Sequence, residues 1–289
     1  MQESAAGQEK DRFDHNWLTL REPADHEARA SALNQRLVEW LPYNQPLGIV
    51  DLGCGQGSNL RYLAPLLPGP QQWTLVDHDE ALLAAALQRC AGIRDSDGQT
   101  LQVDVRQADL RQLADWSSAI GADTQLVTAS ALLDLVSADW LSHLVAVLKS
   151  RRPAIHMVLS VDGQFGCSTL HADDELIRAA FNAHQRGPGP FGHGLGPDAA
   201  AELADRLQAI GYRVQSAASP WHVPTEQAAL QRWLIQGWGD AAIEQCPDQA
   251  DRIKAWTSQR LAEAGSTGFL LTVGHTDVLA LPPMSDRDT

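Results

Sequence analysis

The sequence has no long apolar run. No stretch of its 289 residues approaches the roughly 18 consecutive apolar residues that a membrane-spanning helix requires. The N-terminal segment MQESAAGQEKDRFD is polar and has no apolar core of the kind found in signal peptides. We therefore expect a cytoplasmic protein with no membrane partner.

Positive charge is also scarce. The chain has 22 Lys and Arg against 36 Asp and Glu, which gives a formal net charge of −14. A long-range field of that sign repels a polyanion. This balance argues against a nucleic-acid partner, and we expect either a monomer or a homodimer.

Cysteine and metal-ligand patterns are missing as well. Four cysteines are scattered along the chain without a C-x-x-C pair, so neither a disulfide framework nor a zinc knuckle is indicated. No H-x-x-x-H pair occurs either. We expect reduced cysteines and no metal site.

The most informative stretch that is present is GIVDLGCGQGSNLRY, Gly48–Tyr62. Its apolar start is typical of a central parallel strand, and Gly53, Gly55 and Gly57 permit a tight turn with close backbone approach. The helix that follows would direct its N-terminus at a ligand. Because the spacing is G-x-G-x-G, the stretch departs from the G-x-G-x-x-G dinucleotide pattern. Alone, it indicates either another nucleotide-like site or only a strand–helix turn.

Acidic or polar residues follow the next three predicted strands. Trp73–Val76 ends at Asp77, which is placed to accept hydrogen bonds from ribose hydroxyls, or else caps the next helix. For Asp79 the helix-cap interpretation is favoured. Leu101–Arg106 leads to Asp109, and Thr124–Ala129 leads to Ser130.

These four strand ends, in order from about residue 47 to about residue 160, resemble the class I S-adenosylmethionine-dependent methyltransferases. The resemblance implies an α/β fold with a seven-stranded, mostly parallel Rossmann-like sheet and helices on both faces. It implies S-adenosyl-L-methionine as cofactor and methyl transfer by in-line displacement. After the fourth strand the chain reads Ser130-Ala131-Leu132-Leu133 instead of the Asp/Asn-Pro-Pro-aromatic motif of enzymes that methylate nucleic-acid amines. A small-molecule acceptor is therefore expected.

The resemblance also assigns cofactor contacts. Asp109 would lie near the adenine amine, unless it is only a helix cap. Arg21 would pair with the methionine carboxylate, unless it is a solvated surface residue. The full set of expected cofactor-binding residues is Arg21, Asp51, Gly53, Cys54, Gly55, Gly57, Asp77, His78, Asp109, Leu110 and Ser130.

The C-terminal half completes the sheet with predicted strands at Ala154–Val161, Tyr212–Ala218 and Thr272–Leu281. A Gly/Pro-rich loop, 185–197, is typical of a lid or binding loop. Residues 219–268 are predicted to be a helical cap over the substrate pocket, inserted between the last two strands. Together with a flexible tail over 1–16, this predicts one methyltransferase domain over 17–289.

Acceptor contacts are expected beyond the fourth and fifth strands. Histidine accepts protons near neutrality, which makes His184 and His222 the candidate bases, although a loop histidine more often serves a structural role. The expected acceptor-binding residues are Asp134, His184, Arg186, His193 and Trp221. Two other functions stay open: an aminopropyltransferase-like enzyme, and a non-catalytic S-adenosylmethionine-binding protein.

Overall fold

The computed structural model describes residues 15–43 and 45–283. The predicted tail over 1–16 therefore lies largely outside the described residues. Its last two residues, His15 and Asn16, form the start of a helix, so the prediction was wrong for these two.

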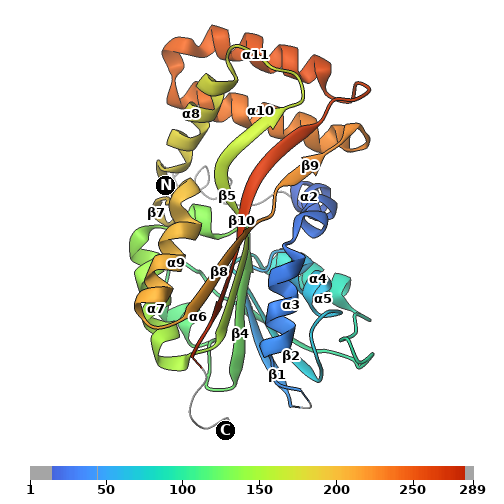
Figure 1. Cartoon of the computed structure of the whole chain (residues 1–289), viewed down its shortest axis with the longest axis vertical. Coiled ribbons are helices and arrows are strands. Elements are labelled where there is room, and N and C mark those ends of the chain that lie inside the picture. The colour runs from blue at the N-terminus through green and yellow to red at the C-terminus, as the bar shows by residue number, and fades with distance from the viewer. Residues whose placement is uncertain (1–14, 44, 284–289) are drawn as a thin grey trace, which may run out of the picture.

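A single large sheet forms the centre of the molecule, with strand order β3-β2-β1-β4-β5-β10-β8 and β9 paired to β10 (Figure 1). The first five strands in chain order are parallel to one another, and β10 is antiparallel to both β5 and β8. The predicted seven-stranded, mostly parallel sheet is confirmed. The strands are β1 Leu47–Leu52, β2 Gln71–Asp77, β3 Gln102–Gln107, β4 Thr124–Ser130, β5 Ala154–Cys167, β8 Arg213–Ala218, β9 Trp221–Val223 and β10 Leu271–Leu281.

Helices cover both faces of the sheet, and each face has its own apolar core. On one face α3, α4 and α5 pack over the sheet, and on the other α6, α7 and α9 do so. Strand side chains alternate between the two cores, as the pleat requires: Ile49 joins the first and Val50 the second. The α-helices are α2 His15–Ala28, α3 Ser31–Trp40, α4 Ser58–Leu63, α5 Glu80–Cys90, α6 Leu113–Ser117, α7 Ala138–Arg151, α8 Asp174–Gln185, α9 Ala199–Ala209, α10 Ala228–Gln245 and α11 Ala250–Glu263.

The N-terminal helical segment differs from the sequence pattern. The apolar spacing from Asp25 to Leu41 favours a single helix introduced by Pro23. In the structure Pro23 lies inside α2, and the helix is interrupted between α2 and α3. At the break the backbone N–H of Ala30 donates to Asp277 Oδ2 at 2.9 Å. The carboxylate on the distant strand β10 thus satisfies the N–H of Ala30, the N-cap residue of α3, and the sequence near the interruption carries no sign of this partner.

Residues between β8 and β10 form the predicted helical insertion, with the unpredicted short strand β9 at its start. Figure 1 shows α10 and α11 beyond the ends of the parallel strands, where long extensions of β5 and β10 reach them. There α10 packs against α8 and α11. This end of the molecule has a third apolar core, which includes Phe165, Trp238 and Trp256. Among the described residues, no helix is both long and apolar enough to cross a membrane.

Candidate functional site

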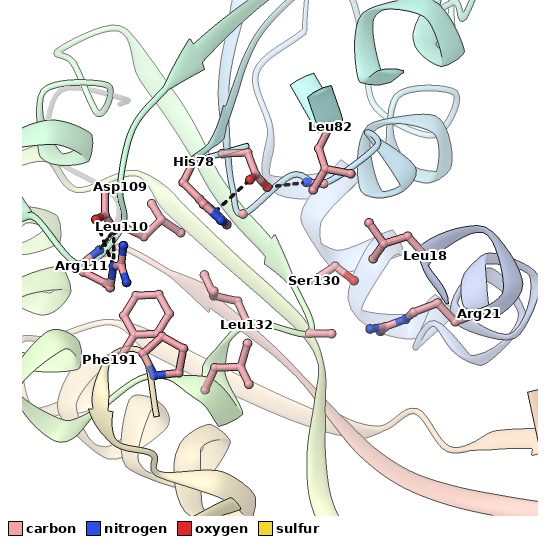
Figure 2. A pocket seen from close by; sticks show the side chains of 16 residues that line it. Leu18, Arg21, His78, Leu82, Asp109, Leu110, Arg111, Ser130, Leu132 and Phe191 are labelled. Carbon is pink, nitrogen blue, oxygen red and sulfur yellow. Dashed lines mark hydrogen bonds and ion pairs between the residues drawn. The ribbon is translucent and has the colours of Figure 1, made fainter. Parts of the chain in front are cut away.

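A cavity of about 310 Å³ opens at the carboxyl ends of β1, β2 and β4, beside the segment that follows β3 (Figure 2). The strand order reverses between β1 and β4, and ligands of open α/β sheets bind at such a switch point. The lining residues are Leu18, Arg21, Gly53, Gly55, Asp77, His78, Leu82, Asp109, Leu110, Arg111, Ser130, Ala131, Leu132, Leu135, Pro190 and Phe191.

The glycine turn after β1 forms the floor of this cavity. Gly55 has φ +53°, and a Cβ there would stand 3.4 Å from Leu18 Cδ1, so a side chain would fill the cavity. Gly57 has φ +76°, and a Cβ there would stand 2.6 Å from Cys90 Sγ. The left-handed conformation and the close neighbours explain why the turn needs glycine. Gly57 itself does not line the cavity in the described structure.

Asp77 is held firmly at the end of β2. Its Oδ2 accepts from the Gly55 N–H at 2.9 Å, and its Oδ1 accepts from the Asp79 N–H at 3.0 Å. His78 Nδ1 lies 3.3 Å from the same Oδ1, and this hydrogen bond raises the pKa of His78. Oδ2 accepts only the Gly55 N–H among the described residues and has a second lone pair, so Asp77 retains capacity to accept from a ligand. Asp79 caps α5 as predicted, with Oδ1 accepting from the Ala81 N–H at 2.8 Å.

Asp109 and Arg111 form the far wall. The Asp109 carboxylate accepts from Arg111 Nε at 2.9 and 3.0 Å and from the Arg111 backbone N–H at 2.9 Å. Partial burial raises the pKa of Asp109, but these bonds outweigh it and hold the pKa below its ordinary value. Asp109 closes a turn and faces the cavity, but it is not the helix cap considered above, because the N-cap residue of α6 is Gln112. Its contact with adenine stays a prediction. Arg111 was not anticipated, and its only signal was its position two residues after Asp109.

Apolar side chains from the end of β4 and from a small hairpin complete the walls. Leu132 and Leu135 follow β4, the latter within the 3-10 helix η1 Leu133–Leu135. Pro190 and Phe191 form the tip of the hairpin β6 Pro188–Gly189 and β7 Gly192–His193. This hairpin lies within the Gly/Pro-rich loop that was expected to cover a ligand. Phe191 was not predicted; its place as the single Phe, Tyr or Trp of that loop is the signal that could have found it.

Arg21 and Leu18 reach the cavity from α2, opposite Arg111 and Phe191 (Figure 2). The Arg21 guanidinium forms a bidentate pair with Asp25, with Nε and a terminal nitrogen donating at 2.9 and 3.0 Å. It also lines an adjoining pocket of about 60 Å³, together with Asp51, Cys54 and Ser130. Arg21 is therefore not a solvated surface residue: its side chain is only 12% exposed.

Asp51 at the end of β1 is fully buried. Its Oδ1 accepts from Asn59 Nδ2 at 2.8 Å, while Oδ2 has no hydrogen-bond partner among the described residues. Burial raises the pKa of Asp51 to about 7, although the Asn59 bond and the charge of Arg29 act in the opposite direction. Burial likewise raises the pKa of the Cys54 thiol, which disfavours the thiolate that a nucleophile requires.

The expected acceptor residues and candidate bases are not among the described residues that line the large cavity. His184 Nε2 is 3.1 Å from Glu244 Oε2, and Arg186 donates to Asp198 at 2.7 Å. His193 is exposed, with its Nδ1 3.3 Å from the Arg186 carbonyl oxygen. His222 is exposed on β9.

Trp221 and Asp134 are also outside that lining. Trp221 is buried, with its ring 5.2 Å from the guanidinium carbon of Arg21. Asp134 lies in η1, which follows β4. Its Oδ1 is buried without a hydrogen-bond partner among the described residues, and burial raises its pKa. The roles predicted for these acceptor residues stay predictions.

His78 is the single histidine among the described lining residues. Within residues 15–43 and 45–283, no three His, Cys, Asp or Glu side chains are arranged to hold a metal ion.

Comparison with known proteins finds similarity to methyltransferases. Residues 49–151 match the family described as methyltransferase domain. Trans-aconitate 2-methyltransferase of Acidovorax ebreus (strain TPSY) is 33% identical over 126 residues, which are 43% of this chain and 41% of that protein. The enzyme of the same name from Mycolicibacterium gilvum (strain PYR-GCK) is 28% identical over 214 residues, 73% of this chain and 74% of the relative.

Among solved structures, a SAM-dependent methyltransferase from Geobacter sulfurreducens, in complex with S-adenosyl-L-homocysteine, is 16% identical. The match has a TM-score of 0.44 and covers 93% of this chain and 98% of that one. The matched domain spans β1 to α7, the part of the chain that carries the glycine turn and the acidic strand ends. Over that domain, the chain is similar to methyltransferases.

Proposed function

We propose that this protein transfers a methyl group from S-adenosyl-L-methionine to a small-molecule acceptor. The observation that carries the proposal is the cavity at the switch point of the sheet, where the ends of four parallel strands meet. Its lining combines the glycine turn of the matched domain with Asp77, Asp109 and Ser130.

The cavity fits the cofactor that the family uses. The space over Gly55 is one that a Cβ would occupy, which allows a ligand to approach the backbone closely. Asp77 offers carboxylate oxygens for the ribose hydroxyls, and Leu82 and Leu110 offer apolar contacts for a flat base. Arg21, which lines the cavity, would pair with the methionine carboxylate. When bound, the cofactor supplies an activated methyl group.

The residues of the chain would act mainly by orientation and exclusion of water. Methyl transfer by in-line displacement requires the acceptor atom to be aligned at about 3 Å from the methyl group, and apolar walls favour this by keeping water out. Leu132, Leu135 and Phe191 form such walls. His184 and His222 stay candidate bases, but both are outside the cavity lining, which favours a transfer that needs no protein base.

The names of the relatives make small carboxylic acids the first acceptor class to test. The lining contains two cations, Arg21 and Arg111, that a carboxylate could share with the acidic side chains they already contact. The net charge of −14 disfavours a nucleic-acid acceptor. The chain spans 41% of the length of the first Acidovorax relative, so its acceptor is a proposal.

Calorimetric titration tests the cofactor. The wild-type protein should bind S-adenosylmethionine and S-adenosylhomocysteine but not NAD or ATP, and Asp77→Asn should weaken binding at least tenfold, about 1.4 kcal/mol. Asp104→Asn, on the exposed part of neighbouring β3, is the matched control and should bind normally. Binding of NAD in preference to the sulfur nucleotides would refute the cofactor assignment.

Turnover then separates the alternatives. Trans-aconitate, other small carboxylic acids and their neutral esters should be incubated with labelled S-adenosylmethionine, and methylated product should form with at least one acid. An aminopropyltransferase-like enzyme would instead prefer decarboxylated S-adenosylmethionine. A non-catalytic binding protein would bind the cofactor and transfer nothing to any acceptor.

A further inference from the structure

The insertion between β8 and β10 touches the N-terminal helix through tryptophan rings. Trp17 of α2 stacks on Trp233 of α10, with ring centroids 3.7 Å apart and planes inclined by 13°. Trp17 also meets Trp221 of β9 edge-on at 6.3 Å. Figure 1 shows α2 lying beside β9 and beneath α10, at the junction of the insertion and the parallel sheet.

The same rings surround Arg21. It follows Trp17 by four residues, so both side chains lie on one face of α2. The guanidinium carbon is 5.6 Å from the Trp17 ring and 5.2 Å from the Trp221 ring, within the range of a cation–π contact. Asp25 holds the guanidinium through two further hydrogen bonds. Arg21 is therefore held by two aromatic rings and one carboxylate.

An arginine held in this way loses little rotamer freedom when it binds a ligand. Arg21 is the cation that borders both the large cavity and the small pocket next to Asp51 in the described structure. Figure 2 shows its side chain pointing from α2 into the cavity. Its orientation therefore bears directly on an anionic group placed there.

Another side of α2 is attached to helices α4 and α5. Arg61 of α4 donates to Glu22 through Nε at 2.9 Å, and Arg89 of α5 donates to Glu22 at 2.6 Å. Helix α2 thus lies between helices α4 and α5 on one side and the insertion on the other. In the described lining of both pockets, no residue comes from 219–268. The insertion meets α2, the helix that carries the lining residues Leu18 and Arg21.

We propose that the insertion acts as an aromatic clamp, in which Trp221 and Trp233 hold Trp17 and so position Arg21 for an anionic ligand group. The three tryptophans are positioning residues and need not touch substrate or cofactor. The ligand group is the carboxylate of the cofactor's methionine portion, so this part of the inference rests on the proposed function. The competing explanation is that these rings only bury apolar surface.

Trp233 is the residue to replace, because it is 45% exposed whereas Trp221 is 3% exposed and its loss would endanger folding. Amide hydrogen exchange of the ligand-free protein gives the first readout. Trp233→Ala should accelerate exchange in α2, Trp233→Phe should restore protection, and Tyr43→Ala, at a side chain 61% exposed away from the clamp, should leave α2 unchanged. Unchanged exchange in Trp233→Ala would overturn the clamp, whatever the protein binds.

A double-mutant cycle on S-adenosylhomocysteine binding gives the second readout. Trp233→Ala should weaken binding about fivefold in the wild-type background, as expected for a lost cation–π arrangement. In an Arg21→Gln background the same change should alter binding by less than about twofold, because the residue it positions is absent. Equal losses in both backgrounds would show a packing role only. A wild-type protein that binds no S-adenosylhomocysteine would refute the proposed function, and hydrogen exchange would still decide the clamp.

Discussion

Replacing Asp51 with Asn should remove a pH dependence of stability that the wild-type protein carries. Asp51 is fully buried, and its pKa is raised from 3.8 to about 7, mainly by that burial. As pH rises above 3.8, the unfolded chain releases this proton while the folded protein keeps it. Stability from this group is therefore complete below pH 3.8 and is lost progressively until pH passes about 7.

The size of the effect follows from the two pKa values. One pKa unit corresponds to about 1.4 kcal/mol. Between about pH 5 and about pH 8, the unfolding free energy that Asp51 contributes should therefore fall by roughly 2.5 kcal/mol. Asp51→Asn keeps an oxygen for Asn59 Nδ2 but introduces an amide that does not titrate. The new buried N–H₂ group adds a cost of about 1–3 kcal/mol, which does not vary with pH.

Urea unfolding of the ligand-free wild type and Asp51→Asn across this pH range is the assay. The difference in unfolding free energy between variant and wild type isolates Asp51, because other titrating groups contribute nearly equally to both. That difference should move in favour of the variant by roughly 2.5 kcal/mol on going from about pH 5 to about pH 8. A constant difference would refute the reasoning, since it would mean that Asn59 and Arg29 keep Asp51 ionised throughout.

Two further predictions concern the glycine turn and the helix after β2. Gly57→Ala should destabilise the fold by at least about 1 kcal/mol through its left-handed backbone, and further through the Cβ placed 2.6 Å from Cys90 Sγ. In a Cys90→Ala background, Gly57→Ala should lose only the backbone part of this cost, as measured by urea unfolding. An equal loss of stability from Gly57→Ala in both backgrounds would exclude the clash. Asp79→Ala should cost about 1 kcal/mol of stability by uncapping α5, whereas Asp79→Asn should retain most of the stability. Thermal unfolding compares the two variants with the wild type. Equal melting temperatures for Asp79→Ala and the wild type would contradict the cap.

The sequence predicted much of the fold because the relevant signals are short and local. A buried apolar strand followed by closely spaced glycines specifies a turn wherever it occurs, and here it placed Gly53 and Gly55 in the cavity wall. Asp77 and Asp109 were found the same way, since the carboxyl ends of parallel strands meet at one edge of a sheet. The Asp79 cap depends on a hydrogen bond between residues only two positions apart, so the sequence predicted it equally well.

What the sequence did not reveal depends on contacts between distant segments. The break between α2 and α3 is stabilised by Asp277, 247 residues away from Ala30. The predicted acceptor residues His184, Arg186 and His193 and the candidate base His222 lie on segments that follow the sheet strands, yet the described cavity lining does not include them.

The surroundings of Arg21 show the division most clearly. Its charge and its place ahead of the first strand were readable from the chain, and they suggested an anion contact. That Trp17, Trp221 and Asp25 enclose it could be decided only in three dimensions, because β9 and α2 are brought together by the antiparallel pairing of β9 with β10. Local propensity acts over a few residues, whereas such an enclosure arises only after the whole sheet has assembled.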